Sequence, residues 1–109
     1  MWIFTKNGFF SAVQNERDSG LIHVRARFKG DLERLCKAYD IKPKVLHTPK
    51  NDYPFRMDFE RETWSRIMAE EAKEIDYTNF KDKIHKDCND GRLDAYNTVW
   101  GIMKLHEYL

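Results

Sequence analysis

Apolar and cationic side chains alternate over residues 22–29, which read Ile-His-Val-Arg-Ala-Arg-Phe-Lys. Successive side chains of a strand point to opposite faces, so this alternation predicts a β-strand with one buried and one solvent-facing side. The buried side is expected to carry Ile22, Val24, Ala26 and Phe28. The opposite side is expected to carry His23, Arg25, Arg27 and Lys29.

Two short runs rich in aromatic and β-branched residues flank Asn7-Gly8 near the start of the chain. Asn-Gly readily takes the positive φ angles of a type I′ turn, so residues 1–14 predict a tight β-hairpin with Asn7 and Gly8 as its loop. In this register Lys6 pairs with Phe9. One face then carries Trp2, Phe4, Phe9 and Val13, and the other carries Ile3, Phe10 and Ala12. Both faces are apolar, which suits a hairpin covered on both sides or one that keeps a face for a partner.

The remaining pattern predicts one further clear strand and four helices. Residues 53–59 alternate again, with Tyr53, Phe55, Met57 and Phe59 expected on one side and Arg56 and Asp58 on the other. Apolar residues three or four apart predict helices from Gly30-Asp31 to before Ile41, over about 61–75, from Asp76 or Thr78 to before Asn89, and over about 92–108. The last helix is expected to turn Leu93, Tyr96, Val99, Trp100 and Met103 inward. A short strand around residues 45–47 is the weakest feature of the pattern.

The predicted order is therefore β-β-β-α-β-α-α-α. It indicates an α+β fold, with a mainly antiparallel sheet of about four strands and helices packed on it. The chain has 109 residues, which is enough for one hydrophobic core and too few for two ordinary domains. We expect a single domain over residues 1–109.

Charge is distributed unevenly along the chain. Residues 1–50 hold ten Lys and Arg against five Asp and Glu, and residues 51–109 hold nine against thirteen, so balances of +5 and −4 sum to the net charge of +1. Such a division steers a polyanion to one side of the protein, or it lets the two halves attract each other. Cys36 and Cys88 have no pairing motif around them, and no apolar run approaches the roughly 20 residues of a membrane span. We expect free thiols and a cytoplasmic protein without a membrane segment.

The sequence contains no signature of catalysis, of a cofactor or of a metal. His85 and Cys88 lie three residues apart on a predicted helix, but a zinc site needs three or four ligands. No serine lies in a nucleophile elbow, and the five glycines are too scattered for a phosphate-binding loop. We therefore predict a protein that is not an enzyme and holds neither cofactor nor metal. An enzyme whose site is assembled from distant residues is the remaining alternative.

The best candidate for a binding surface is the cationic side of the strand at 22–29. Alternate residues of a strand lie about 7 Å apart, close to the phosphate spacing of a single-stranded nucleic acid, and nearby aromatic rings offer stacking surfaces. A solvent-facing strand also carries Lys and Arg as protection against aggregation, or is covered by an acidic helix. The segment Asp52–Arg56 adds an aromatic and an arginine, the composition of interface hot spots. The candidate surface comprises His23, Arg25, Arg27, Lys29, Tyr53 and Arg56.

Several sequence blocks resemble a family of small bacterial and phage proteins. They are Met1-Trp-Ile-Phe-Thr5 with Gly8-Phe-Phe-Ser-Ala-Val-Gln14, Val24-Arg-Ala-Arg27, Asp52-Tyr-Pro-Phe-Arg56, Ile75-Asp-Tyr-Thr-Asn-Phe-Lys81 and Tyr96-Asn-Thr-Val-Trp100. The resemblance covers nearly the whole chain and implies a bacterial or phage cytosolic setting, with an accessory role such as modulating a host defence protein. It implies no catalytic residues.

Fifteen aromatic residues are many for a domain of this size, which favours a protein partner or a homodimer. We therefore expect a binding module that acts through a protein interface. The alternative is a nucleic-acid-binding module that uses the face of Arg25 and Arg27.

Overall fold

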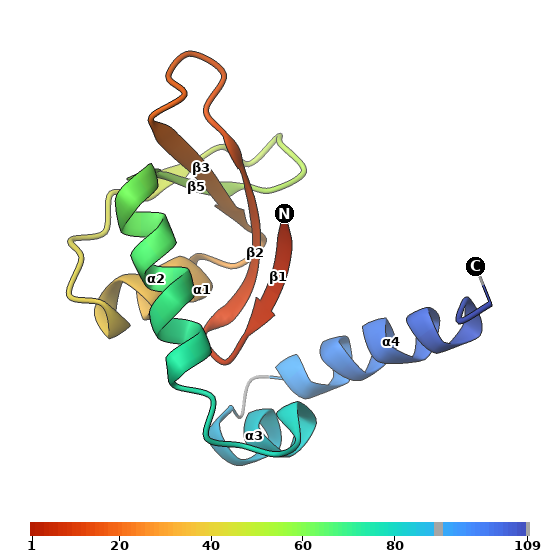
Figure 1. Cartoon of the computed structure of the whole chain (residues 1–109). Coiled ribbons are helices and arrows are strands. Elements are labelled where there is room, and N and C mark those ends of the chain that lie inside the picture. The colour runs from red at the N-terminus through yellow and green to blue at the C-terminus, as the bar shows by residue number, and fades with distance from the viewer. Residues whose placement is uncertain (89–90, 109) are drawn as a thin grey trace. The chain divides into compact units, whose positions relative to one another are not determined.

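The structure is a computed structural model that describes residues 1–88 and 91–108. The chain divides into two compact units, Met1–Ile75 and Asp76–Leu109 (Figure 1). The first unit contains β1 (Trp2–Thr5), β2 (Gly8–Gln14), β3 (Leu21–Ala26), α1 (Lys29–Ala38), β4 (Leu46–His47), β5 (Phe55–Glu60) and α2 (Arg61–Lys73). The second contains α3 (Phe80–Asp87) and α4 (Arg92–Leu105). The expectation of a single domain stays a prediction.

The five strands form one sheet in the order β1-β2-β3-β5-β4, and every neighbouring pair is antiparallel. This confirms the predicted α+β fold with an antiparallel sheet. The short strand expected around residues 45–47 is β4, which adds a fifth strand at the edge beyond β5. Pro54 immediately precedes β5, a position where its missing amide proton costs no hydrogen bond of the sheet. Within the described residues, no helix is long and apolar enough to cross a membrane.

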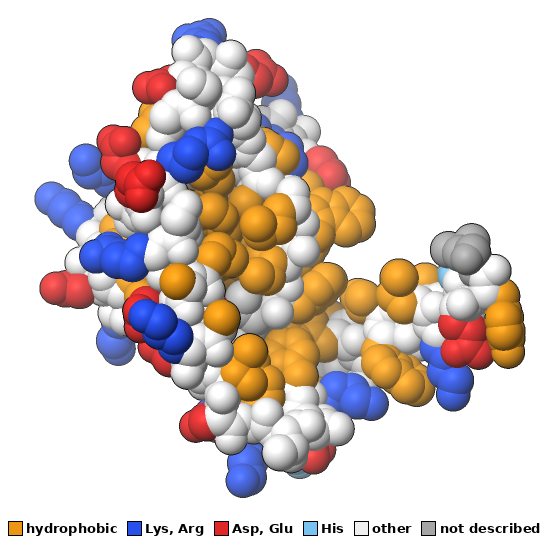
Figure 2. All heavy atoms as spheres, in the orientation of Figure 1, with side chains coloured by type: hydrophobic (Ala, Val, Ile, Leu, Met, Phe, Trp, Pro, Cys, Tyr) orange, Lys and Arg blue, Asp and Glu red, His pale blue; other side chains and the backbone are white. Residues whose placement is uncertain are grey.

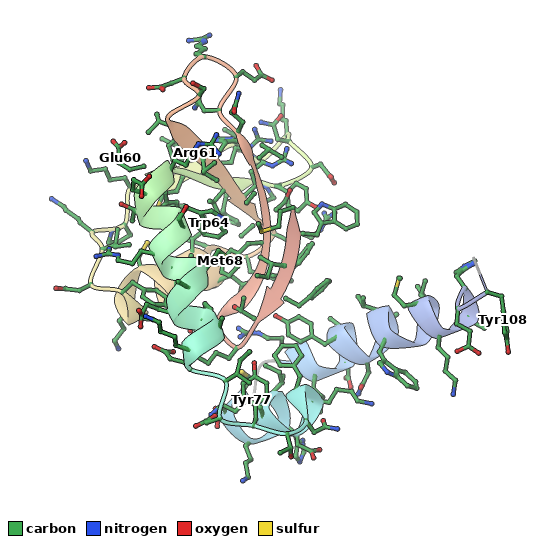
Figure 3. The ribbon with its side chains drawn as sticks, in the orientation of Figure 1. Glu60, Arg61, Trp64, Met68, Tyr77 and Tyr108 are labelled. Carbon is green, nitrogen blue, oxygen red and sulfur yellow. The ribbon has the colours of Figure 1, made fainter. Side chains whose placement is uncertain are left out.

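Helices α1 and α2 cover one face of the sheet (Figure 1). The outside of α2 is polar, and Figure 2 shows acidic and basic side chains spread over it. Its inward side presents Trp64 and Met68, which extend from the helix toward the strands in Figure 3. The α-helical spacing of the apolar residues thus places one stripe against the sheet and leaves charged residues in water.

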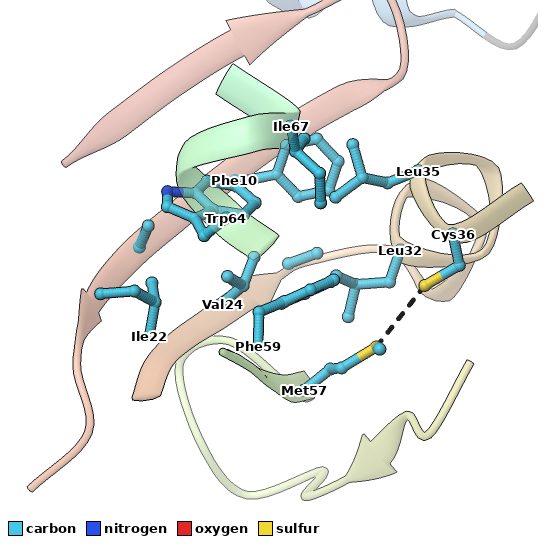
Figure 4. Close-up of a cluster of buried hydrophobic side chains, with 12 residues drawn as sticks. Phe10, Ile22, Val24, Leu32, Leu35, Cys36, Met57, Phe59, Trp64 and Ile67 are labelled. Carbon is cyan, nitrogen blue, oxygen red and sulfur yellow. Dashed lines mark hydrogen bonds between the residues drawn. The ribbon is translucent and has the colours of Figure 1, made fainter. Parts of the chain in front are cut away.

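The hydrophobic core fills the space between the two helices and the sheet (Figure 4). Its buried members are Phe10, Ala12, Ile22, Val24, Ala26, Leu32, Leu35, Cys36, Met57, Phe59, Trp64 and Ile67. Complete burial of one large apolar side chain such as Leu35 stabilises the fold by about 1.5–3 kcal/mol. The predicted core sides of β3, α1 and α2 are confirmed at these positions.

The hairpin of β1 and β2 turns earlier than the sequence predicts. Its register pairs Thr5 with Gly8 and Phe4 with Phe9, so Lys6 and Asn7 form the loop and the predicted Asn7-Gly8 loop is wrong. Among described residues other than glycine, a positive φ occurs only at Asp40, so the turn is not of type I′. The predicted pairing of β1 with β2 is shifted by two residues from the observed pairing. Because side chains of a strand alternate with a period of two, every side chain still lies on its predicted face.

The strands predicted over residues 22–29 and 53–59 are both longer than the strands of the structure. β3 ends at Ala26, so Lys29 is instead the first residue of α1, and Phe28 precedes that helix with 70% of its surface exposed. Tyr53 lies before β5 and its ring contacts Phe9, on the opposite side of the sheet from Met57. The alternation predicts a strand from residue 53 onward, but β5 begins only after Pro54, at Phe55.

The second unit consists of α3, α4 and their connection. Asn79, rather than the expected Asp76 or Thr78, caps α3, and its side-chain oxygen accepts a hydrogen bond from the Asp82 amide at 3.0 Å. The rings of Phe80 and Tyr96 stack at 5.6 Å between α3 and α4. The expectation that α4 turns all its large apolar residues inward is wrong, because Val99, Trp100 and Met103 are exposed.

Candidate functional site

The candidate site is the outer face, defined as the side of the sheet that points away from α1 and α2. The register places on it side chains of β1, β2, β3 and β5: Trp2, Phe4, Phe9, Ser11, Val13, His23, Arg25, Arg56 and Asp58. Arg27 and Tyr53 flank the ends of β3 and β5 and reach the same face. The structure thus brings together five of the six predicted site residues. Lys29 is not part of a strand.

One half of the outer face is aromatic. The rings of Phe4 and Phe9 are stacked with their centroids 4.5 Å apart, and Trp2 meets Phe9 edge to face at 6.2 Å. Trp2 remains 72% exposed, and Tyr53 continues the cluster at 6.3 Å from Phe9. Aromatic pairs in these geometries contribute about 0.5–1.5 kcal/mol beyond the apolar area that they bury. The cluster is therefore a stable surface on which Trp2 stands out toward solvent.

Tyr53 joins the aromatic half of the outer face to its cationic half. The guanidinium carbons of Arg25 and Arg27 lie 4.9 and 4.8 Å from the centroid of its ring. The ring is only 5% exposed. Each cation–π contact at such a site contributes about 0.5–2 kcal/mol. The sequence named these three residues as candidates but placed Tyr53 on the core side.

The charged residues of β3 and β5 lie in rows across the two strands. In one row His23 stands opposite Asp58, and its Nδ1 lies 2.9 Å from the Asp58 carboxylate, which also accepts a hydrogen bond from Asn15. In the next row Arg25 stands opposite Arg56. Neither arginine forms an ion pair with any described residue. Like charges directly opposite each other destabilise a sheet. The cationic half therefore contains one row of two arginines that has no ion pair among the described residues.

Neighbouring groups hold both guanidinium groups in position. Arg25 Nη2 donates to Ser11 Oγ at 2.8 Å, and Arg56 Nε donates to the Tyr53 carbonyl oxygen at 3.0 Å. Arg25 Nε is buried and has no acceptor. Because these hydrogen bonds use only part of the five donors of each guanidinium, the remaining donors are available for an external acceptor.

A hollow of about 380 Å³ lies beside this row. Its lining combines the two arginines and His23 with the end of β2 and the start of the β2–β3 connection: Val13, Gln14, Asn15, Glu16 and Arg17. Arginine is the side chain best suited to bind a planar carboxylate or a phosphate through paired hydrogen bonds. The chemistry that the outer face supports is therefore recognition of an anionic group beside an aromatic surface.

The described part of the chain bears on two further kinds of site, a metal-ligand cluster and a reactive thiol. It contains no group of three or more His, Cys, Asp or Glu that could hold a metal ion. Cys36 and Cys88 are free thiols, as predicted. Burial raises the pKa of the Cys36 thiol, which lies 3.6 Å from the Met57 sulfur in the core. A buried, protonated thiol is a poor nucleophile.

Six residues of the outer face are missing from the candidate surface predicted from the sequence: Trp2, Phe4, Phe9, Ser11, Val13 and Asp58. The alternation along the first strands already predicts that Trp2 and Phe9 lie on this side of the hairpin. Ser11, only 1% exposed and hydrogen-bonded to Arg25, carried no signal of its own because serine has no strong preference for such a role. Comparisons of the chain with protein-family models, with curated proteins and with solved structures found no match.

Proposed function

We propose that this protein is a binding module whose outer face engages a protein partner carrying a carboxylate. The observation that carries the proposal is the Arg25–Arg56 row, in which two arginines stand opposite each other on neighbouring strands and neither forms an ion pair with a described residue. An aspartate, a glutamate or a chain terminus of the partner placed there relieves the repulsion and forms charge-assisted hydrogen bonds.

The aromatic half supplies the apolar part of such an interface. Trp, Tyr and Arg are the residues most enriched among interface hot spots, and the outer face exposes Trp2 beside arginines that a buried Tyr53 supports. Trp2 is the anchor of this surface because it is the most exposed ring of the cluster and rests on Phe9. The partner is expected to cover Trp2 and to place its anionic group over Arg25 and Arg56.

A single-stranded nucleic acid is the second candidate partner, because a phosphate also binds paired guanidinium groups. The rings favour a protein. Tyr53 is covered by two arginines, and Phe4 and Phe9 stack on each other, so Trp2 offers the main ring face for a base. Binders of single strands stack successive bases on several rings. The resemblance to small bacterial and phage proteins supports an accessory role in a bacterial cell.

The test is capture of partners from a bacterial lysate by immobilised protein, with and without nuclease treatment. We expect the wild-type chain to retain a protein that the Trp2→Ala and Arg56→Gln variants do not retain, whether or not nuclease is present. Arg66→Gln, at an exposed position of α2, is the matched control for the loss of one arginine charge. Capture that disappears with nuclease supports the nucleic-acid candidate instead. Equal capture by all variants excludes the outer face as the binding surface.

A further inference from the structure

Trp64 carries a buried hydrogen-bond donor that the protein does not use. The residue is 4% exposed, and its indole Nε1 has no hydrogen-bond acceptor. In Figure 4 the nitrogen end of the ring lies away from Leu35 and Ile67, toward the part of the core near Ile22. Buried polar groups of native proteins nearly always have a partner, so this donor calls for an explanation.

The same indole lines a second hollow, which lies between α2 and the end of β2 and has a volume of about 380 Å³. The lining is mainly apolar: Met1, Ala12, Val13, Ile22, Trp64 and Met68, with Gln14, Arg61 and Ser65 as its polar members. Figure 2 shows apolar side chains gathered on this part of the surface, below a basic side chain. The size lies within the range of about 300–1,000 Å³ that is usual for small-molecule sites.

Three residues of α2 make one end of this hollow cationic and the other end apolar. Arg61, Trp64 and Met68 follow one another along the same side of the helix, as Figure 3 shows. The Arg61 guanidinium donates to the Ser19 carbonyl oxygen and to Gln14 Oε1 but forms no ion pair with a described residue. The hollow therefore has a cationic end with an unused N–H nearby and an apolar end at Met68.

We propose that this hollow binds a small amphiphile, an unbranched hydrocarbon chain that ends in a carboxylate. The carboxylate accepts hydrogen bonds from Arg61 and from Trp64 Nε1, which lie one helical turn apart. The hydrocarbon chain lies along Ala12, Ile22 and Met68. The indole nitrogen is buried, so binding requires side chains of the lining to shift, and Met68 in that lining is unbranched and flexible.

The probe is decanoate below its micellar concentration, and the readout is the indole N–H resonance of Trp64 in a ¹⁵N–¹H spectrum. The chain has three tryptophans, and the resonance that Trp64→Phe removes identifies Trp64. We expect decanoate to shift this resonance downfield with saturation below about 1 mM, while those of Trp2 and Trp100 stay in place. Decanol, which has the same chain without the charge, should bind at least about tenfold more weakly.

Two variants complete the test. Arg61→Gln should weaken decanoate binding about tenfold, whereas Arg66→Gln on another side of α2 should leave it unchanged. Trp64→Phe keeps a smaller aromatic ring without the donor and should also weaken decanoate binding, measured for this variant by calorimetry because it lacks the reporting indole. The proposal is overturned by an absence of saturable shift, by equal shifts of all three indoles, or by full affinity in the Trp64→Phe variant.

Discussion

Arg25 and Arg56 stand directly opposite each other on β3 and β5, and neither forms an ion pair with a described residue. In the adjoining row, His23 stands opposite Asp58, and its Nδ1 lies 2.9 Å from the Asp58 carboxylate. A sheet that sets two like charges opposite each other, as in the row of Arg25 and Arg56, has given up stability at a defined place. Such a local conflict is typical of a binding site.

The first prediction follows from this repulsion. Arg56→Gln should raise the free energy of unfolding by about 0.2–1 kcal/mol, because it removes a like-charge pair while its amide can still donate to the Tyr53 carbonyl oxygen. Urea unfolding followed by circular dichroism measures the change. Arg66→Gln should leave the stability of the protein unaltered. A clear loss of stability in Arg56→Gln would mean that the two arginines are held apart by interactions that outweigh their repulsion.

The second prediction concerns the hairpin turn. A Cβ added at Gly8, where φ is +155°, would lie 2.4 Å from Cγ of Asp31, which also accepts a hydrogen bond from the Phe9 amide at 3.2 Å. Gly8→Ala should therefore destabilise the protein by at least about 2 kcal/mol in urea unfolding. Gly101→Ala is the matched control. Its Cβ meets no atom within 4 Å inside α4, so it should increase helix stability by about 0.5–1 kcal/mol.

The opposite outcome for this pair of glycine variants is informative. If Gly8→Ala unfolds at the same urea concentration as the wild type, then Asp31 is not fixed against the hairpin, and the contact between α1 and β2 at this turn is looser than the structure shows.

The third prediction is a pH dependence that comes from Tyr39. Burial and, next, the carboxylate of Glu71 raise its pKa above the ordinary value of 10.0. The unfolded chain therefore loses this phenol proton at a lower pH than the folded protein, and the free energy of unfolding falls as the pH rises above about 10. Unfolding measured at about pH 8 and about pH 11 should show a smaller decrease for Tyr39→Phe than for the wild type. Equal decreases would assign the pH dependence to other groups.

Much of the fold follows from alternation and helical spacing. Ile22, Val24 and Ala26 are buried because their spacing matches the period of a strand, and the same period assigns Trp2 and Phe9 to the outer face. The local pattern of apolar and polar residues is sufficient to predict the face of a residue when both of its neighbours lie in the same strand or helix. It places His23, Arg25 and Arg56 on the outer face, where the register of the sheet also has them.

The errors occur where distant residues decide the local structure. The hairpin turns at Lys6 and Asn7, where Asp31, on α1, lies beside Gly8 and accepts a hydrogen bond from the Phe9 amide. Tyr53 leaves the core side because Arg25 and Arg27 cover its ring, which no reading of residues 53–59 alone reveals. Trp100 was assigned inward by its spacing, yet it is 53% exposed, with Lys81 and Lys104 over its ring.

The role of the outer face is tested most directly by titrating a purified, captured protein partner into the wild-type chain and its variants in a calorimeter. We predict that Arg56→Gln and Trp2→Ala each weaken the affinity at least about tenfold, while Arg66→Gln binds as the wild type does. Equal affinity of all four proteins for the partner would contradict the proposal that the row of Arg25 and Arg56, together with Trp2, forms the binding surface.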